Sequence, residues 1–249
     1  KIILIMKLTY AIVIPCFDEE KKLDYGYYVD FLHKNPEYCI YFVNDGSKDK
    51  TLDCLLEIKT DCPKQVFIIN QNKNKGKAET VRNGMLQALS AGKFKYVGYF
   101  DADLSIPLEE YKEMLYIFDN KIKVVMGSRI SRLGSNIEKS LFRHIAGRFI
   151  ATIISKILKL SVYDTQCGAK VFSVDIIKPL FNEHFKSTWL FDVEIIARSI
   201  RAYGHNRTLN LFYEYPLKKL IHKSGSKVKI SYVFFIFYEL LHIKIKYKI

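Results

Sequence analysis

Two carboxylates stand directly after a short apolar run in the sequence. The run is YVGYF at 96–100, and Asp101 and Asp103 follow it with a single alanine between them. Two acidic groups this close repel each other unless a cation is present. A hard divalent cation, bound by one or two carboxylates and by substrate phosphates, suits such a pair. We therefore predict that Asp101 and Asp103 hold Mg²⁺ or Mn²⁺, with solvated loop acids as the simpler alternative.

Other polar segments also follow apolar runs in the first half of the chain. Asp45, in NDGS at 44–47, can accept hydrogen bonds from a nucleobase or a ribose. The basic segment NQNKNKGK at 70–77 ends in Lys77, which suits a loop beside a diphosphate at the start of a helix. Each segment alone is also compatible with an ordinary turn. Two more segments of this kind are PCFDEE at 15–20, whose acids also suit a helix N-terminus, and GSR at 127–129.

The elements that position these segments alternate between strand and helix signals. Short apolar runs predict five strands, and the stretches between them have helical character. This order predicts an α/β fold with a mostly parallel sheet flanked by helices. Ligands of such sheets bind beyond the carboxyl ends of the strands, where the polar segments lie. The expected strands are 9–14, 38–43, 65–69, 96–100 and 123–126, and the expected helices between them are 19–34, 50–59, 77–90 and one that opens at 105–107.

The second half of the chain is more helical. Residues 139–160 place apolar side chains on one stripe and Lys and Arg beside it, which predicts an amphipathic helix. A further helix is expected at 190–203. Residues 230–249 combine a dense apolar block with a basic tail. We predict that 139–160 and 230–249 lie on a membrane surface without crossing it, with packing on the sheet as the alternative.

Composition excludes several classes of protein. The chain has 249 residues, of which 49% are hydrophobic, so a sizeable core is expected and global disorder is excluded. Five cysteines without CxxC spacing argue against a disulfide framework and a zinc site. The net charge of +13 suits nucleic acid, anionic lipid or phosphorylated small molecules. No GxGxxG follows the first strand, which argues against a Rossmann dehydrogenase.

Taken in order, the motifs resemble those of the family 2 glycosyltransferases, which have the GT-A fold. The second half resembles the dolichyl-phosphate β-glucosyltransferases more specifically, with the polyprenyl-phosphate sugar transferases and dolichyl-phosphate mannosyltransferases as close relatives. The resemblance runs from about residue 12 to the C-terminus. It is carried by VIPCFDEE at 13–20, VNDGSKDKT at 43–51, NKNKGKAETVRNGM at 72–85, YFDADLSIP at 99–107, GSR at 127–129, YDTQCGAKVFS at 163–173, WLFDVEIIAR at 189–198 and SGSK at 224–227.

The resemblance implies an inverting, metal-dependent transfer of a sugar from a nucleotide donor to a polyprenyl or dolichyl phosphate. UDP-glucose is the favoured donor, and GDP-mannose and other UDP-sugars stay open. Asp192 stands where relatives that act on hydroxyl groups keep their catalytic base, and Asp101 and Arg129 join it as catalytic candidates. The implied nucleotide-sugar site is Pro15, Phe17, Glu19, Asp45, Lys77 and Asp101. The implied cations for the acceptor phosphate or the diphosphate are Arg129, Arg143, Lys170 and Lys227.

Some positions depart from the family pattern. Asp18 replaces the usual Asn, Asn44 replaces the first Asp of DDGS, and Ala169 replaces an aromatic residue. The eukaryotic glucosyltransferases carry an N-terminal membrane helix that has no counterpart in these residues. Because residue 1 is Lys, a truncated start and a natural start at Met6 both stay open.

We expect a single GT-A domain over 1–249, with a nucleotide-sugar half at about 8–130 and an acceptor half with membrane-surface helices at about 131–249. The expected place is the cytoplasmic face of a membrane, bound peripherally to anionic lipid and without a nucleic-acid partner. Two alternatives remain: a family 2 enzyme that glycosylates a saccharide hydroxyl, and a non-catalytic basic module that binds nucleotide or nucleic acid.

Overall fold

A computed structural model describes residues 8–134, 137, 141–221 and 231–249 of the chain. Its centre is a seven-stranded sheet with the order β3-β2-β1-β4-β6-β5-β7. Six strands run in parallel, and β6 runs against its neighbours β4 and β5. The strands are β1 (Tyr10–Cys16), β2 (Tyr38–Asn44), β3 (Val66–Asn70), β4 (Tyr96–Phe100), β5 (Val124–Ser128), β6 (Ala169–Ser173) and β7 (Phe212–Pro216).

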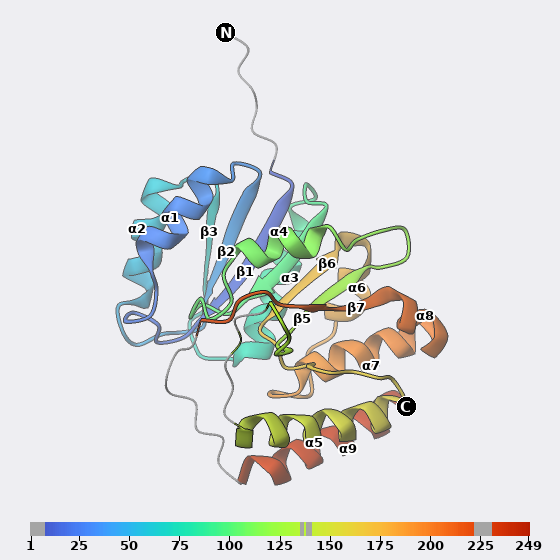
Figure 1. Cartoon of the computed structure of the whole chain (residues 1–249). Helices are drawn as coiled ribbons and strands as arrows, with labels where there is room; N and C mark the ends of the chain where they lie inside the picture. Colours follow the sequence, from blue (N-terminus) through green and yellow to red (C-terminus); the bar gives the residue numbers. More distant parts are fainter. Residues whose placement is uncertain (1–7, 135–136, 138–140, 222–230) are drawn as a thin grey trace.

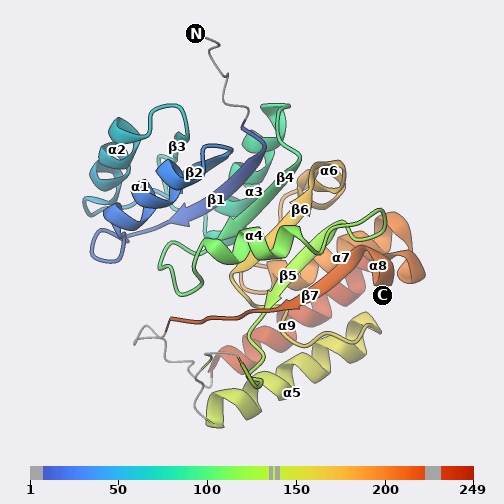
Figure 2. The ribbon, with the colours of Figure 1, turned by 45° about the horizontal axis from the view of Figure 1, so that its top comes forward.

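Helices cover both faces of the sheet (Figures 1 and 2). Successive strand residues point to opposite faces, so β1 sends Ile12 into one core and Val13 into the other. One core is closed by α1 (Tyr25–Lys34), α2 (Thr51–Asp61) and α4 (Glu109–Leu115). The other is closed by α3 (Lys77–Ser90), α5 (Leu141–Leu158), α6 (Val174–Phe181), α7 (Phe191–Tyr203), α8 (His205–Leu211) and α9 (Ser231–Tyr247). The mostly parallel α/β sheet expected from the sequence is confirmed.

The structure differs from the predicted elements at several places. The first helix begins at Tyr25 rather than Glu19, because the Asp24 carboxylate accepts the Tyr27 amide as an N-cap at 3.0 Å. Residues 19–23 instead form a turn, in which the Lys22 amide donates to the Glu19 carbonyl at 2.8 Å. Four elements were not predicted: the short strands β6 and β7 and the short helices α6 and α8.

The helix α9 is fixed to α7 by buried charge. Glu239 accepts the backbone amides of Thr188 and Leu190, at 2.8 and 3.0 Å, just before α7 begins. Glu194, which is fully buried in α7, accepts the Tyr247 hydroxyl at 2.6 Å and the Arg198 guanidinium at 3.0 Å. Buried charges are tolerated only when they are paired and hydrogen-bonded in this way. The inner face of α9 is therefore part of the protein core.

The outer faces of α5 and α9 expose large apolar side chains. The two helices lie side by side on the outer side of α7, away from the sheet (Figure 1). We call their exposed apolar residues the α5/α9 face: Ile145, Phe149, Phe235, Phe237, Tyr238, Leu241 and Ile245. Among the described residues, no helix is long and apolar enough to cross a membrane. The inner sides of both helices thus pack in the core, and the membrane-surface prediction for their exposed outer sides stays a prediction.

The five cysteines give a direct test of how the protein core is packed. Cys16, Cys39, Cys62 and Cys167 are buried, and Cys54 is half-buried. Burial raises the pKa of Cys39 and Cys167 to about 12, so almost no thiolate, the reactive form, exists at pH 8. We expect maleimide to label Cys54 first in the native protein and all five thiols in denaturant, as read by peptide mass spectrometry. Rapid native labelling of Cys39 or Cys167 would contradict the fold.

Candidate active site

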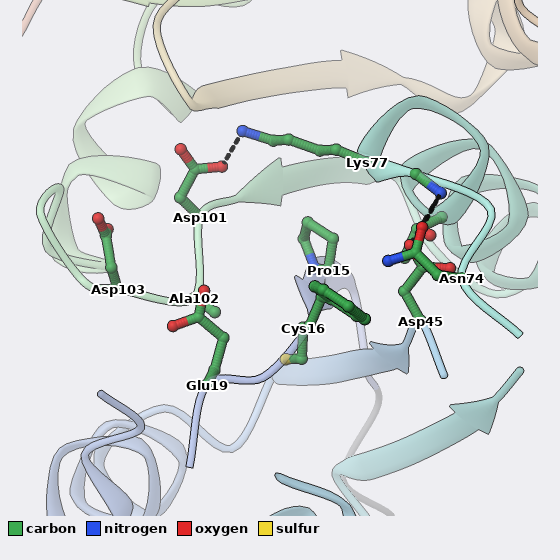
Figure 3. Close-up of a pocket in the computed structure, with 12 residues that line it drawn as sticks. Pro15, Cys16, Glu19, Asp45, Asn74, Lys77, Asp101, Ala102 and Asp103 are labelled. Atoms are coloured by element: carbon green, nitrogen blue, oxygen red, sulfur yellow. Dashed lines mark hydrogen bonds and ion pairs between the residues drawn. The ribbon is translucent and has the colours of Figure 1, made fainter. Parts of the chain in front are cut away.

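A cleft of about 350 Å³ opens at the carboxyl ends of β1, β2 and β4 (Figure 3). All seven residues that the sequence suggested for the nucleotide sugar and the metal line this cleft: Pro15, Phe17, Glu19, Asp45, Lys77, Asp101 and Asp103. They come from four different loops, each of which follows one strand or opens one helix. The parallel strands bring these loops to one edge of the sheet, where ligands of α/β proteins bind.

The carboxylates of the cleft are held in distinct ways. Lys77 extends across one side of the cleft, and its Nζ lies 2.5 Å from Asp101 Oδ1 (Figure 3). Burial pulls the pKa of Lys77 down, but the charge of Asp101 and their hydrogen bond outweigh it, so this pKa lies above its ordinary value. Asp103 Oδ1 accepts the Ser105 amide at 2.9 Å. A cation therefore already sits against the Asp101 carboxylate.

The loops 15–20 and 44–51 interlock through side-chain contacts to backbone amides. The Asp18 carboxylate accepts the Lys48 amide at 2.8 Å, and the Thr51 hydroxyl accepts the Glu19 amide at 2.8 Å. Asp18 has a positive φ of 50°, which these contacts stabilise. The loops therefore hold Phe17 and Glu19 in place before any ligand binds.

Asp45 fixes the basic loop opposite it. Its two carboxylate oxygens accept the amides of Lys75 and Gly76, at 2.7 and 2.9 Å. Gly46, with a φ of +68°, lets the chain turn so closely that a Cβ there would lie 2.7 Å from the Lys73 backbone. Asp45 thus shapes the cleft wall, and carboxylate lone pairs stay open for a ligand N–H or O–H.

Arg129 does not line the cleft, in contrast to the sequence expectation that it faces phosphate. Its guanidinium forms a two-point ion pair with Asp164, with Nε–Oδ2 at 2.7 Å and Nη2–Oδ1 at 2.8 Å. The Arg129 amide donates to the same carboxylate at 3.0 Å. GSR at 127–129 and the DTQCG motif at 164–168 therefore bind each other in the structure described.

Lys170 and Asp192 do not line the cleft either, because they form an ion pair with each other. Lys170 is fully buried; its Nζ lies 2.8 Å from Asp192 Oδ1 and donates to the Cys167 carbonyl at 2.7 Å. The Tyr99 hydroxyl donates to the same Asp192 oxygen. Asp192 is only 5% exposed. A phosphate could reach Lys170 only by breaking this buried pair, which is costly.

The order of strands in the sheet explains why GSR at 127–129 lies away from the cleft. Along the chain β5 is the next strand after β4, but in the sheet β6 lies between them. Neighbouring strands are about 4.8 Å apart, so the end of β5 lies about 10 Å from the end of β4. The remaining two predicted cations are not placed: Lys227 lies outside the described residues, and Arg143 belongs to α5 but its side chain is outside the described part.

Some residues of the cleft were not singled out from the sequence. Cys16, Asn74, Gly76, Thr80 and Ala102 also line it. Asn74 and Gly76 fall inside the motif at 72–85, so this motif could have indicated that they line the cleft. Thr80 lies one turn into α3 after Lys77, and helical spacing alone could have placed it beside that residue.

The donors of the cleft fit a divalent cation that shares its ligands with a substrate. Among the residues described, no group of three or more His, Cys, Asp or Glu side chains is arranged to enclose a metal ion. Asp101 and Asp103 supply hard carboxylate oxygens, and the contact of Asp101 with Lys77 shows that this carboxylate already faces positive charge. Mg²⁺ prefers such partial sites, completed by phosphate oxygens and water.

Comparison with known proteins agrees with this geometry. The sequence model of the family described as "Glycosyl transferase family 2" matches residues 11–181, more than half of the chain. The chain belongs to the family 2 glycosyltransferases. It is 28% identical to a dolichyl-phosphate beta-glucosyltransferase of Trichomonas vaginalis, over 96% of this chain and 74% of that protein. It is 28% identical to the Saccharomyces cerevisiae protein of the same name, over 78% of this chain and 64% of that protein.

Solved structures of other proteins show the same arrangement of elements. Glucosyl-3-phosphoglycerate synthase from Mycobacterium tuberculosis, in complex with UDP, superposes with a TM-score of 0.65. The superposition covers 96% of this chain and 79% of that chain, at 13% identity. A complex of the same synthase with Mn²⁺, UDP and glucosyl-3-phosphoglycerate gives a TM-score of 0.64. At this identity the likeness concerns the arrangement of the elements alone.

The Arg129–Asp164 pair generates a test of stability. In Asp164→Ala, the half-buried guanidinium loses a two-point partner, and hydrogen bonds to charged groups contribute about 1.5–3 kcal/mol. We expect the free energy of unfolding, measured in urea, to fall by about 2–3 kcal/mol. The control is Asp30→Ala, whose 3.6 Å contact with Lys34 is exposed and should be worth under about 0.5 kcal/mol. Equal losses in the two variants would contradict this account.

Proposed function

We propose that the protein transfers a sugar, with glucose from UDP-glucose favoured, to a polyprenyl or dolichyl phosphate. The observation that carries this is the gathering of all seven predicted donor-site residues in one cleft. The acceptor follows from the relatives, which are named dolichyl-phosphate beta-glucosyltransferases in several organisms. In the reaction the acceptor phosphate oxygen attacks C1 of the sugar, and the bond from C1 to the nucleotide diphosphate breaks.

Different residues of the cleft contact different parts of the nucleotide sugar. Asp45 accepts hydrogen bonds from the nucleoside, and Phe17, which is 42% exposed, offers a flat apolar surface beside it. Lys77, whose side chain extends from the Asp45 side of the cleft to Asp101 (Figure 3), meets the diphosphate. The N-terminus of α3, which begins at Lys77, adds the partial positive charge of its free amides.

Asp101 and Asp103 are the proposed ligands of Mg²⁺ or Mn²⁺. The bound cation would neutralise negative charge on the departing diphosphate. Lys77 contributes a second positive charge at the same place. When no metal ion is bound, its ion pair keeps the Asp101 carboxylate oriented. A cation requirement is in keeping with the Mn²⁺ and Mg²⁺ complexes of the mycobacterial synthase.

A phosphate acceptor changes what the protein must supply. The second pKa of a phosphate monoester is about 6, so the acceptor is mostly dianionic near neutral pH and needs no strong general base. Asp192 is therefore free to serve as the buried partner of Lys170 and Tyr99, and we propose that positioning role for it. A saccharide hydroxyl would need a base in contact with the acceptor.

The proposed site of action is the cytoplasmic surface of an anionic membrane. The α5/α9 face carries seven large apolar residues. The sequence of α5 contains Arg and Lys without any Asp or Glu, and the acid of α9, Glu239, is buried. Apolar side chains flanked by basic charge are the pattern of helices that lie in the membrane interface.

Transfer assays test the reaction directly. We expect UDP-glucose with a short polyprenyl phosphate to give a lipid-linked sugar, measured by radiolabelled product extraction. Asp103→Asn should lower the rate by at least about 100-fold, because loss of the carboxylate removes a metal ligand while the loop geometry is kept.

The other arms of that assay are GDP-mannose as donor and an oligosaccharide or 3-phosphoglycerate as acceptor. Transfer to an oligosaccharide alone would make this a saccharide-hydroxyl enzyme. If neither hydrolysis nor transfer is seen with any donor, the result would favour a non-catalytic binding module. Full activity in excess chelator would remove the metal from the mechanism.

Liposome co-sedimentation tests the membrane surface. We expect binding to anionic liposomes at low salt and release as salt rises, since each basic residue near the surface contributes about 1 kcal/mol. Serine at Phe149, Leu241 and Ile245 together should weaken binding, and the exposure of all three side chains keeps the effect on folding small. Truncation of α9 is a poor test, because Glu239 and Tyr247 belong to the core.

The matched control carries serine at Leu56 and Tyr116, which are exposed apolar residues away from the α5/α9 face. It should bind liposomes like the unaltered protein. If the unaltered protein stays in the supernatant at low salt, the interfacial proposal is wrong and an acceptor in solution becomes the better hypothesis.

A further inference from the structure

The loop that precedes β6 lies directly against the first carboxylate of the proposed metal site. The Gly168 carbonyl accepts the Asp101 amide at 3.0 Å, which extends the antiparallel ladder between Phe100 and Ala169. A Cβ built on Gly168 would lie 2.0 Å from Asp101 Oδ2, 2.4 Å from its Cγ and 2.8 Å from its Oδ1. The whole carboxylate group therefore occupies the space that any side chain at 168 would need.

Backbone conformation does not explain the glycine. Gly168 is absent from the glycines with positive φ, which include Gly46, Gly76 and Gly204. Its φ therefore lies outside the left-handed region that alanine avoids. The requirement for glycine at 168 is thus purely a matter of space, and the neighbour that takes up this space is Asp101.

The loop has little freedom to retreat from Asp101. Upstream it is held by the ion pair of Asp164 with Arg129. Downstream, Lys170 donates to the Cys167 carbonyl and pairs with the buried Asp192. Cys167 itself is fully buried. A side chain at 168 would therefore push the Asp101 carboxylate, the free end of a short side chain, rather than the loop.

We propose that Gly168 is a positioning residue for Asp101, and that the segment from Asp164 to Lys170 acts as the rear wall of the proposed metal and diphosphate site. This rests on the proposed role of Asp101. On this proposal Arg129, Lys170 and Asp192 contribute by holding the wall. Gly168 touches no substrate and acts through the carboxylate alone.

The first experiment measures the affinity of Mn²⁺ in the presence of UDP by titration calorimetry. Gly168→Ala should weaken this affinity by about 10- to 100-fold, the usual effect of disturbing a group that orients a metal ligand. Gly26→Ala is the control, because its Cβ would meet only Asp24 Oδ1 at 3.7 Å, an ordinary contact, and Gly26 does not line the cleft. An unchanged affinity in Gly168→Ala overturns the proposal.

A double-mutant cycle separates positioning from general damage. In an Asp101→Ala background the carboxylate is gone, so Gly168→Ala should cause no further loss of Mn²⁺ affinity. A second loss of similar size in that background would show that Gly168 acts elsewhere, and would overturn the proposal.

The same double-mutant cycle can be measured through the melting temperature, which needs no bound ligand. Gly168→Ala should lower the melting temperature by a few degrees in the unaltered protein and by less with Asp101→Ala, because the crowding has been relieved. Equal shifts in both backgrounds would count against the contact. If the unaltered protein binds neither UDP nor Mn²⁺, the proposed function fails, whereas coupling in the melting temperature would still support Gly168 as the residue that places Asp101.

Discussion

The antiparallel pairing of β6 with β4 is the constraint on which the candidate site depends. In a sheet of parallel strands, each strand delivers only its own loop to the carboxyl edge. Because β6 runs the other way, the loop before it reaches the same edge and lies against Asp101. The first half of the chain thus supplies all the residues that line the cleft, and the second half packs against one of them, Asp101.

The first half of the fold could be predicted from sequence with little error. Its strands are continuous apolar runs such as YCIYFV, which are typical of strands buried on both faces, and its loops carry Gly, Asn and Asp. The start of α1 was misplaced because Glu19 and Glu20 resemble a helical first turn. In the structure the amides of both residues are bound by the neighbouring loop, and Asp24 caps the helix instead.

The second half was harder for a physical reason. Polar residues interrupt both β6 (AKVFS) and β7 (FYEYP), and β7 ends in a proline, so neither has a distinct apolar pattern. Arg129 and Lys170 were assigned to phosphate because they fall in motifs of the family resemblance and carry positive charge. Their acidic partners, Asp164 and Asp192, lie 35 and 22 positions further along the chain, and only the fold brings each pair together.

The buried pairing of α7 with α9 also affects the order in which the protein can form. Glu194 meets Tyr247 across 53 positions, and the amide of Leu190 meets Glu239 across 49. During synthesis, β1 to β4 can pair while the rest of the chain is still being made, because all four strands lie within the first 100 residues. Until α9 has been made, the Thr188 amide lacks its Glu239 acceptor and Glu194 lacks the Tyr247 hydroxyl, although Arg198 of α7 can already pair with Glu194. The α7–α9 contacts therefore form after the pairing of β1 to β4, and a nascent chain paused before residue 239 is exposed to chaperones and proteases at α7.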